Sequence, residues 1–80
     1  MRFDNGLDDD AFAALDFYEE TGANILKAYT HNKEALRLHE KGFYKAAKHH
    51  AEHVQSLSLN AIQKIGLALE LVKKIDQKKR

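Results

Sequence analysis

Two long stripes of mostly apolar side chains, separated by Gly42, dominate this sequence. Within each stripe the residues recur every three or four positions, which places them on one face of an α-helix. Glycine readily adopts the left-handed conformation that ends a helix. The pattern therefore predicts a helix at about residues 8–41, a turn at 42 and a helix at about 43–77. The first stripe contains Ala11, Leu15, Tyr18, Gly22, Ile25, Tyr29, Asn32, Leu36 and His39, and the second contains Phe43, Ala47, His50, Val54, Leu57, Ala61, Ile65, Ala68, Val72 and Ile75.

The composition favours an all-α fold, in a single helical domain over residues 1–80. The chain has no proline, its common residues include good helix formers such as Ala, Leu, Lys and Glu, and no segment alternates with the period of a strand. Two segments carry helix-breaking signals: residues 21–22, and residues 60–63, which resemble a capping box. Because the stripes keep their phase through both segments, we expect each helix to be continuous.

The length of the second helix limits how the chain can be arranged. A helix over residues 43–77 is about 50 Å long at about 1.5 Å per residue. A compact globule of this chain length is only about 30 Å across. The sequence therefore predicts a long antiparallel helical hairpin, and the alternative is a compact monomeric bundle of three or four shorter helices.

Apolar residues surround much of both helices in the halves far from the turn. A helix that is apolar all round is buried on all sides, whereas one hairpin partner covers only one side. We therefore expect a homodimer in which two hairpins form a four-helix bundle. The residues predicted to form the oligomer interface are Phe12, Leu15, Leu57, Ile62, Ile65, Leu69 and Val72.

Several of the histidines are candidate metal ligands. His49 and His53 are four residues apart, as in helical zinc sites, and a hairpin centred near Gly42 places His31 level with His53. At about 100° per residue, however, His31 and His49 point away from the seam between the helices, and only His50 lies within it. The chain also lacks the Glu-x-x-His pattern of di-metal bundles. We therefore expect structural or solvated histidines and no cofactor. Zinc or another divalent transition metal at His31, His49 and His53, within one chain or across an oligomer interface, is the alternative.

Charge and motif content narrow the classes of function. A formal net charge of +1 argues against a dedicated nucleic-acid binder. There is no phosphate-binding loop, and no histidine and acid are placed to form a catalytic triad with either serine. No apolar run is long enough to span a membrane, the acidic start lacks the features of a secretory signal, and cysteine is absent, so a cytoplasmic protein is expected.

These observations predict a protein that is not an enzyme and has no catalytic residues. We expect a helical protein–protein interaction, assembly or regulatory module that acts through a second copy or another protein partner. The alternative is a small histidine-based metal-binding bundle.

Overall fold

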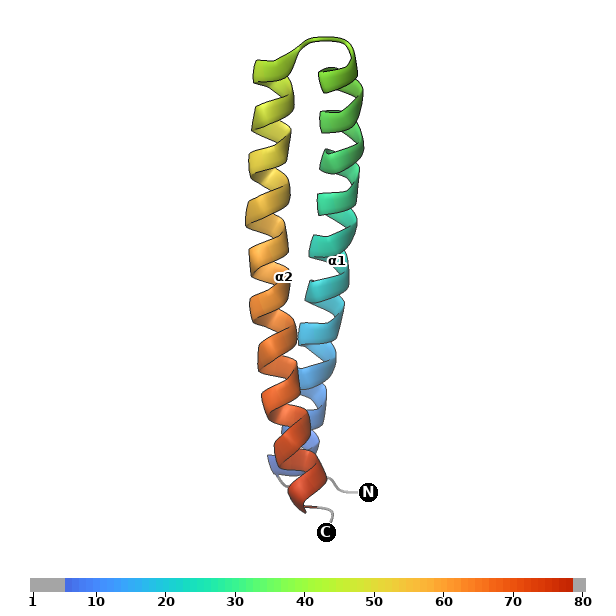
Figure 1. Ribbon diagram of the computed structural model, residues 1–80. Coiled ribbons are helices and arrows are strands. Elements are labelled where there is room, and N and C mark those ends of the chain that lie inside the picture. The colour runs from blue at the N-terminus through green and yellow to red at the C-terminus, as the bar shows by residue number, and fades with distance from the viewer. Residues whose placement is uncertain (1–5, 79–80) are drawn as a thin grey trace.

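The computed structural model describes the backbone of residues 6–78 and the side chains of residues 9–77, and it consists of two α-helices packed side by side (Figure 1). α1 spans Gly6–Glu40 and α2 spans Tyr44–Lys78. The helices are antiparallel, so the start of α1 and the end of α2 lie at the end opposite the turn. Neither helix is interrupted at residues 21–22 or 60–63. The predicted all-α helical hairpin is therefore confirmed.

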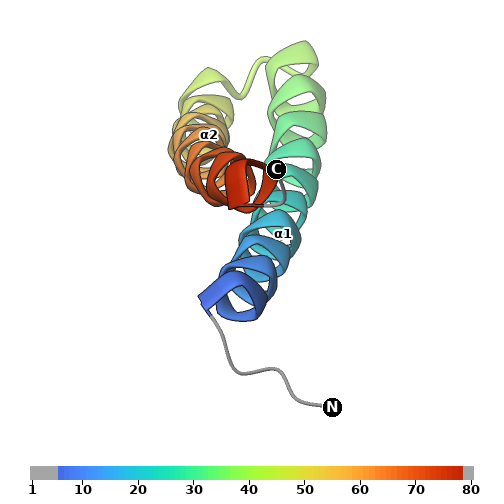
Figure 2. The same ribbon diagram turned by 90° about the horizontal axis from the view of Figure 1, so that it is seen from below.

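The hairpin is a rod of 58 × 21 × 13 Å. Its radius of gyration is 17.9 Å, whereas a compact chain of this length has a value of about 12 Å. The compact bundle of three or four helices is therefore wrong. Seen from the end opposite the turn, the first turns of α1 lie to one side of the last turns of α2, so the two helices cross at an angle (Figure 2).

The turn is a Schellman motif centred on Gly42. Gly42 has a φ of +87°, in the left-handed region. The backbone N–H of Phe43 donates to the carbonyl of Leu38 over 2.9 Å, and the N–H of Gly42 donates to the carbonyl of His39 over 3.0 Å. These bonds satisfy carbonyls that the end of α1 leaves without helical partners. The predicted helix stop at Gly42 thus has its expected physical cause.

The seam between the helices is built mainly from small residues. The fully buried apolar side chains among the described residues are all alanines, and the side chain of Ala68 is 0% exposed. Thr21 is also buried, and its hydroxyl donates to the carbonyl of Phe17 over 2.7 Å, so no polar group is left unsatisfied there. Small side chains allow two helix axes to approach closely. The seam residues are Ala14, Phe17, Thr21, Asn24, Ala28, His31, Ala35 and Leu38 of α1, and Ala47, His50, Val54, Leu57, Ala61, Lys64, Ala68, Leu71 and Ile75 of α2.

The stripe expected to pack in α1 is wrong by one residue. All nine of its members are exposed, whereas the packed stripe runs one position earlier, through Ala14, Thr21 and Ala28. One residue corresponds to a rotation of about 100° around the helix. The packed stripe contains the smaller residues, which fit against Ala47, Ala61 and Ala68 of α2 at short range, and the larger apolar residues are left outside. In α2 the expected stripe agrees with the packed one at Ala47, His50, Val54, Leu57, Ala61, Ala68 and Ile75.

Candidate functional site

One side of the hairpin carries a surface of large hydrophobic side chains, most of them exposed and two of them, Ile65 and Val72, half-buried; we call it the apolar face. Its α1 residues are 45–59% exposed, a large fraction for apolar side chains of this size. They recur at helical spacing on the flank of α1 next to the packed stripe. The apolar face comprises Leu15, Tyr18, Ile25, Tyr29 and Leu36 of α1 and Ile62, Ile65, Leu69 and Val72 of α2.

A groove joins the two helices across the apolar face. It has a volume of about 410 Å³, and Ile25 of α1 faces Ile62 and Ile65 of α2 along it. Thr21, Ser58 and Ala61 complete its lining. The groove therefore connects the α1 and α2 parts of the apolar face at Ile25, Ile62 and Ile65.

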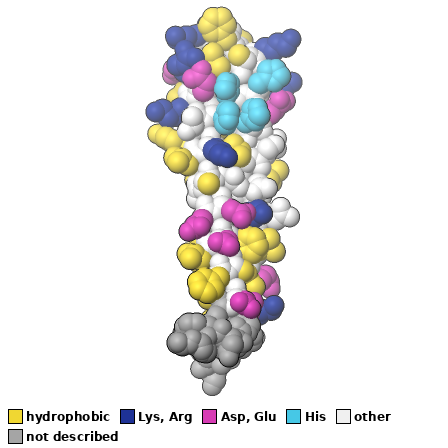
Figure 3. Space-filling model, turned by 180° about the vertical axis from the view of Figure 1, so that it is seen from behind, with side chains coloured by type: hydrophobic (Ala, Val, Ile, Leu, Met, Phe, Trp, Pro, Cys, Tyr) yellow, Lys and Arg dark blue, Asp and Glu magenta, His cyan; other side chains and the backbone are white. Residues whose placement is uncertain are grey.

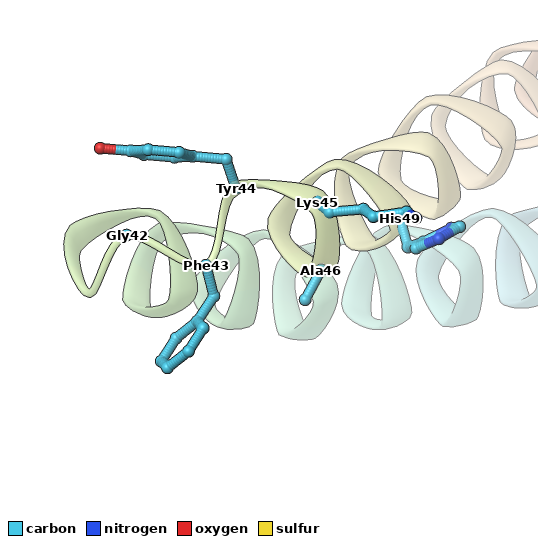
Figure 4. Close-up of a pocket in the computed structure, with 6 residues that line it drawn as sticks. All are labelled: Gly42, Phe43, Tyr44, Lys45, Ala46 and His49. Carbon is cyan, nitrogen blue, oxygen red and sulfur yellow. The ribbon is translucent and has the colours of Figure 1, made fainter.

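The turn end has its own hollow, lined by Gly42, Phe43, Tyr44, Lys45, Ala46 and His49 (Figure 4). The rings of Phe43 and Tyr44 leave the chain on opposite sides, and both are well exposed. Lys45 and His49 are the only ionisable side chains of its lining apart from Tyr44. These groups do not form a pair of general acid and base with a nucleophile, so the hollow carries no recognisable catalytic arrangement.

The opposite flank of the seam is polar, and its side chains bond to one another across the helices. We call it the polar face. The side-chain amide of Asn24 donates to Oδ1 of Asn60 over 2.6 Å. Nζ of Lys64 lies 2.9 Å from Oε1 of Glu20 and 5.6 Å from the ring centroid of Phe17. The residues that define the polar face are Glu20, Asn24 and His31 of α1 and His53, Asn60 and Lys64 of α2.

The cross-helix pairs of the polar face fix the register of the hairpin. In the pairs Glu20 with Lys64, Asn24 with Asn60, and His31 with His53, the two residue numbers always add to 84. A constant sum means that the antiparallel register does not slip over this length. Asn60, which resembled a helix cap in the sequence, therefore serves as a cross-helix hydrogen-bond acceptor.

Three histidines, His31, His50 and His53, lie together at the seam beside the polar face. Figure 3 shows histidine side chains gathered in the half of the molecule nearer the turn. Nδ1 of His31 and Nδ1 of His50 are 2.9 Å apart and share a hydrogen bond. The ring of His53 stacks on that of His31, with centroids 4.8 Å apart and an interplanar angle of 16°. The expected register, with His31 level with His53, is thus confirmed.

The structure changes which histidines belong together. His31 was expected to point away from the seam, and this is wrong because the packed stripe of α1 passes through it. His49 does point outward: its side chain is 70% exposed and lies 3.7 Å from Oε1 of Glu52. Among residues 9–77, no three or more histidine or acidic side chains are placed to hold one metal ion.

Glu34 and Arg37 form an ion pair beside the histidine cluster. Nε of Arg37 donates to Oε1 of Glu34 over 3.0 Å, and Nη2 of Arg37 contacts Oε2 of the same carboxylate. The hydrogen bond from Arg37 holds the pKa of Glu34 below its ordinary value, and the positive charges of Arg37, His50 and Lys41 act in the same direction. The carboxylate of Glu34 is therefore already engaged by a cation.

The residues predicted to form an oligomer interface fall into three groups. Leu15, Ile62, Ile65, Leu69 and Val72 lie on the apolar face. Leu57 lies in the seam and is half-buried within the hairpin itself. Phe12 is 67% exposed and lies on the flank of α1 beyond the apolar face. Tyr18, Ile25, Tyr29 and Leu36 also lie on the apolar face but were not among the predicted interface residues; the sequence pattern placed them only in the stripe expected to pack within the hairpin.

Comparison with known proteins finds no matching family model, no matching curated protein and no matching solved structure. Within residues 6–78, neither helix is both long and apolar enough to cross a membrane.

Proposed function

We propose that this chain is a non-catalytic assembly module in which the apolar face of one hairpin packs against that of a second copy, giving a dimeric four-helix bundle. The observation that carries the proposal is an inversion of the usual burial pattern. Alanines occupy the buried positions of the hairpin, while large apolar side chains such as Ile25, Ile62 and Leu69 stay more than half exposed. Burial of these side chains is the largest stabilising contribution that the single hairpin leaves unused.

The accessible area supports a partner of substantial size. A compact protein of 9.1 kDa exposes about 4,900 Å², whereas this hairpin exposes 6099 Å². The excess is about 1,200 Å², and a standard protein–protein interface buries about 800 Å² on each partner. This excess belongs to the elongated chain as a whole, and the apolar face is the side of it that a second copy would cover.

The sidedness of the hairpin favours a second copy as the partner. The polar face already satisfies its groups within the chain, through the Asn24–Asn60 hydrogen bond and the Glu20–Lys64 ion pair. The nine residues that define the apolar face are uncharged, and two lysines border it near the turn: Lys48 lines a hollow with Leu36, and Nζ of Lys33 lies 5.7 Å from the ring centroid of Tyr29. Two copies can therefore meet through the half of the apolar face far from the turn, around Ile25, Ile62 and Leu69, in the self-complementary contact of a two-fold dimer. The polar faces then remain in water on the outside.

A pair of neighbouring substitutions tests the proposal. Ile62 is 65% exposed on the apolar face, whereas Gln63 is exposed on another side of α2. We expect Ile62→Glu to shift the protein from dimer to monomer, because the interface then has to bury a carboxylate without a partner. The matched control Gln63→Glu introduces the same charge one residue away and should leave the dimer intact. Size-exclusion chromatography with light scattering measures both.

Two results would contradict the proposal. One is a wild-type protein that stays monomeric at concentrations of tens of micromolar. The other is a dimer that both variants disrupt equally, because the contact then does not depend on the apolar face.

A further inference from the structure

The hydrogen-bonded pair His31 and His50 has a geometry that also suits a metal ion. The two Nδ1 atoms, one from each helix, are 2.9 Å apart. An imidazole nitrogen lies about 2.0–2.1 Å from a bound ion such as zinc. Two such nitrogens at right angles around an ion are therefore about 2.9 Å apart, and at a tetrahedral angle they are about 3.4 Å apart. The hydrogen-bonded pair already holds the two Nδ1 atoms at this spacing, so an ion requires the rings to turn but not the two nitrogens to move far apart.

We propose that His31 and His50 form an open site for a divalent transition-metal ion with tetragonal preference, such as nickel or copper, bridging α1 and α2. Imidazole suits both ions, and a square-planar or tetragonal arrangement of nitrogen and oxygen ligands is typical of them. Water fills the remaining positions, because the described residues offer no third ligand that converges on the same point. The proposal is independent of dimer formation, since both ligands come from one chain.

Metal binding requires a modest rearrangement of the two rings. In the hydrogen bond, one Nδ1 carries the proton and the other accepts it. For chelation, the donating ring carries its proton on Nε2 instead, and each ring turns so that its Nδ1 lone pair faces the ion. The terminal torsion of histidine has a broad distribution, so such a rotation is inexpensive. Both helix backbones stay in place.

The neighbours of the pair determine which other residues take part. His53 stacks on His31 with its ring plane nearly parallel, so it supports the orientation of His31 rather than pointing a nitrogen at the ion. The carboxylate of Glu34 is held by Arg37. His49 is on the outside of α2 beside Glu52. The site therefore has two protein ligands, and it differs from the His49 and His53 pair that the spacing alone suggested.

Calorimetric titration of the full chain with nickel chloride tests this assignment. We expect one nickel ion per chain, and we expect His31→Ala and His50→Ala each to weaken binding at least about tenfold. The matched control His49→Ala should keep the wild-type affinity within about twofold. Circular dichroism of the metal-free variants verifies that each remains helical.

A second measurement does not depend on the variants. Pulsed electron paramagnetic resonance of the wild-type chain loaded with one equivalent of copper should count two imidazole nitrogens bound to the ion. Three results would overturn the proposal: no nickel binding by the wild type, loss of binding in His49→Ala as large as in His31→Ala, or a count of fewer than two coordinated imidazoles.

Discussion

Replacing Ala68 with leucine tests whether the small-residue seam determines the packing of the hairpin. The side chain of Ala68 is 0% exposed, so three additional carbon atoms have no path to solvent and push the two helices apart. Overpacking of this kind costs about 1–3 kcal/mol. Leucine and alanine are both good helix formers, so helix propensity contributes little to the difference.

The expected loss is large enough to measure by thermal unfolding. In a domain of this size, 1 kcal/mol shifts Tm by about 4–8 °C. A cost of about 2 kcal/mol, the middle of the range, therefore lowers Tm by about 8–16 °C. Circular dichroism in the far ultraviolet follows the transition, with all proteins at the same concentration because a dimer makes Tm depend on concentration.

Ala23→Leu is the matched control because it makes the same chemical change at an exposed position of α1. Exposed substitutions usually change stability by less than about 0.5 kcal/mol. A Tm for Ala68→Leu within about 2 °C of the wild type, or an equal loss in both variants, would refute the description of the seam.

Three further predictions concern the turn, an ion pair and the apolar face. Gly42→Ala should destabilise the protein by about 1–2 kcal/mol in urea unfolding, because alanine at a φ of +87° is strained although no atom lies within 4 Å of the added Cβ. Arg37→Gln should raise the pKa of Glu34, measured by nuclear magnetic resonance titration. In the wild type, the stabilisation of the fold by the ionised Glu34 is present above the ordinary glutamate pKa and is lost as the pH falls through the lowered pKa. An unchanged pKa in the variant would contradict the ion pair. Leu69→Glu should lower Tm by more than Lys48→Glu, because the first replaces an apolar side chain of the apolar face with a charge, whereas the second exchanges one exposed charge for another. Equal Tm values would show that this face is not buried in solution.

The second helix and the turn could be predicted from the sequence because the local sequence signals agree with the packing that the structure shows. In α2 the stripe at helical spacing already contains the alanines that pack, and Gly42 is the residue type that a left-handed helix stop requires. Local preference and tertiary packing point to the same structure there, so the expected stripe was mostly correct.

The first helix has two stripes at helical spacing, one residue apart, and the more hydrophobic stripe is not the one that packs against α2. The stripe through Tyr18, Ile25 and Tyr29 is more apolar, but the stripe through Ala14, Thr21 and Ala28 is the one that packs. The fit of small residues against Ala47 and Ala61 of α2 depends on the partner surface, which the periodicity of α1 alone does not contain.

The orientation of His31 was wrong for the same reason. An angular position counted from the wrong stripe places His31 toward solvent, whereas His31 lies in the seam. Matched side chains on the two helices could have identified the packed side of α1: Glu20 with Lys64 and Asn24 with Asn60 are complementary pairs in the same register. Those pairs place His31 on the seam side of α1.

Sedimentation equilibrium of the unmodified protein at micromolar concentration tests the pairing of two hairpins most directly. The chain has a mass of 9.1 kDa, so pairing through the apolar face predicts a single species of twice that mass, about 18 kDa. A species of 9.1 kDa at every concentration, with no rise in mass as the protein is concentrated, would contradict the proposed assembly.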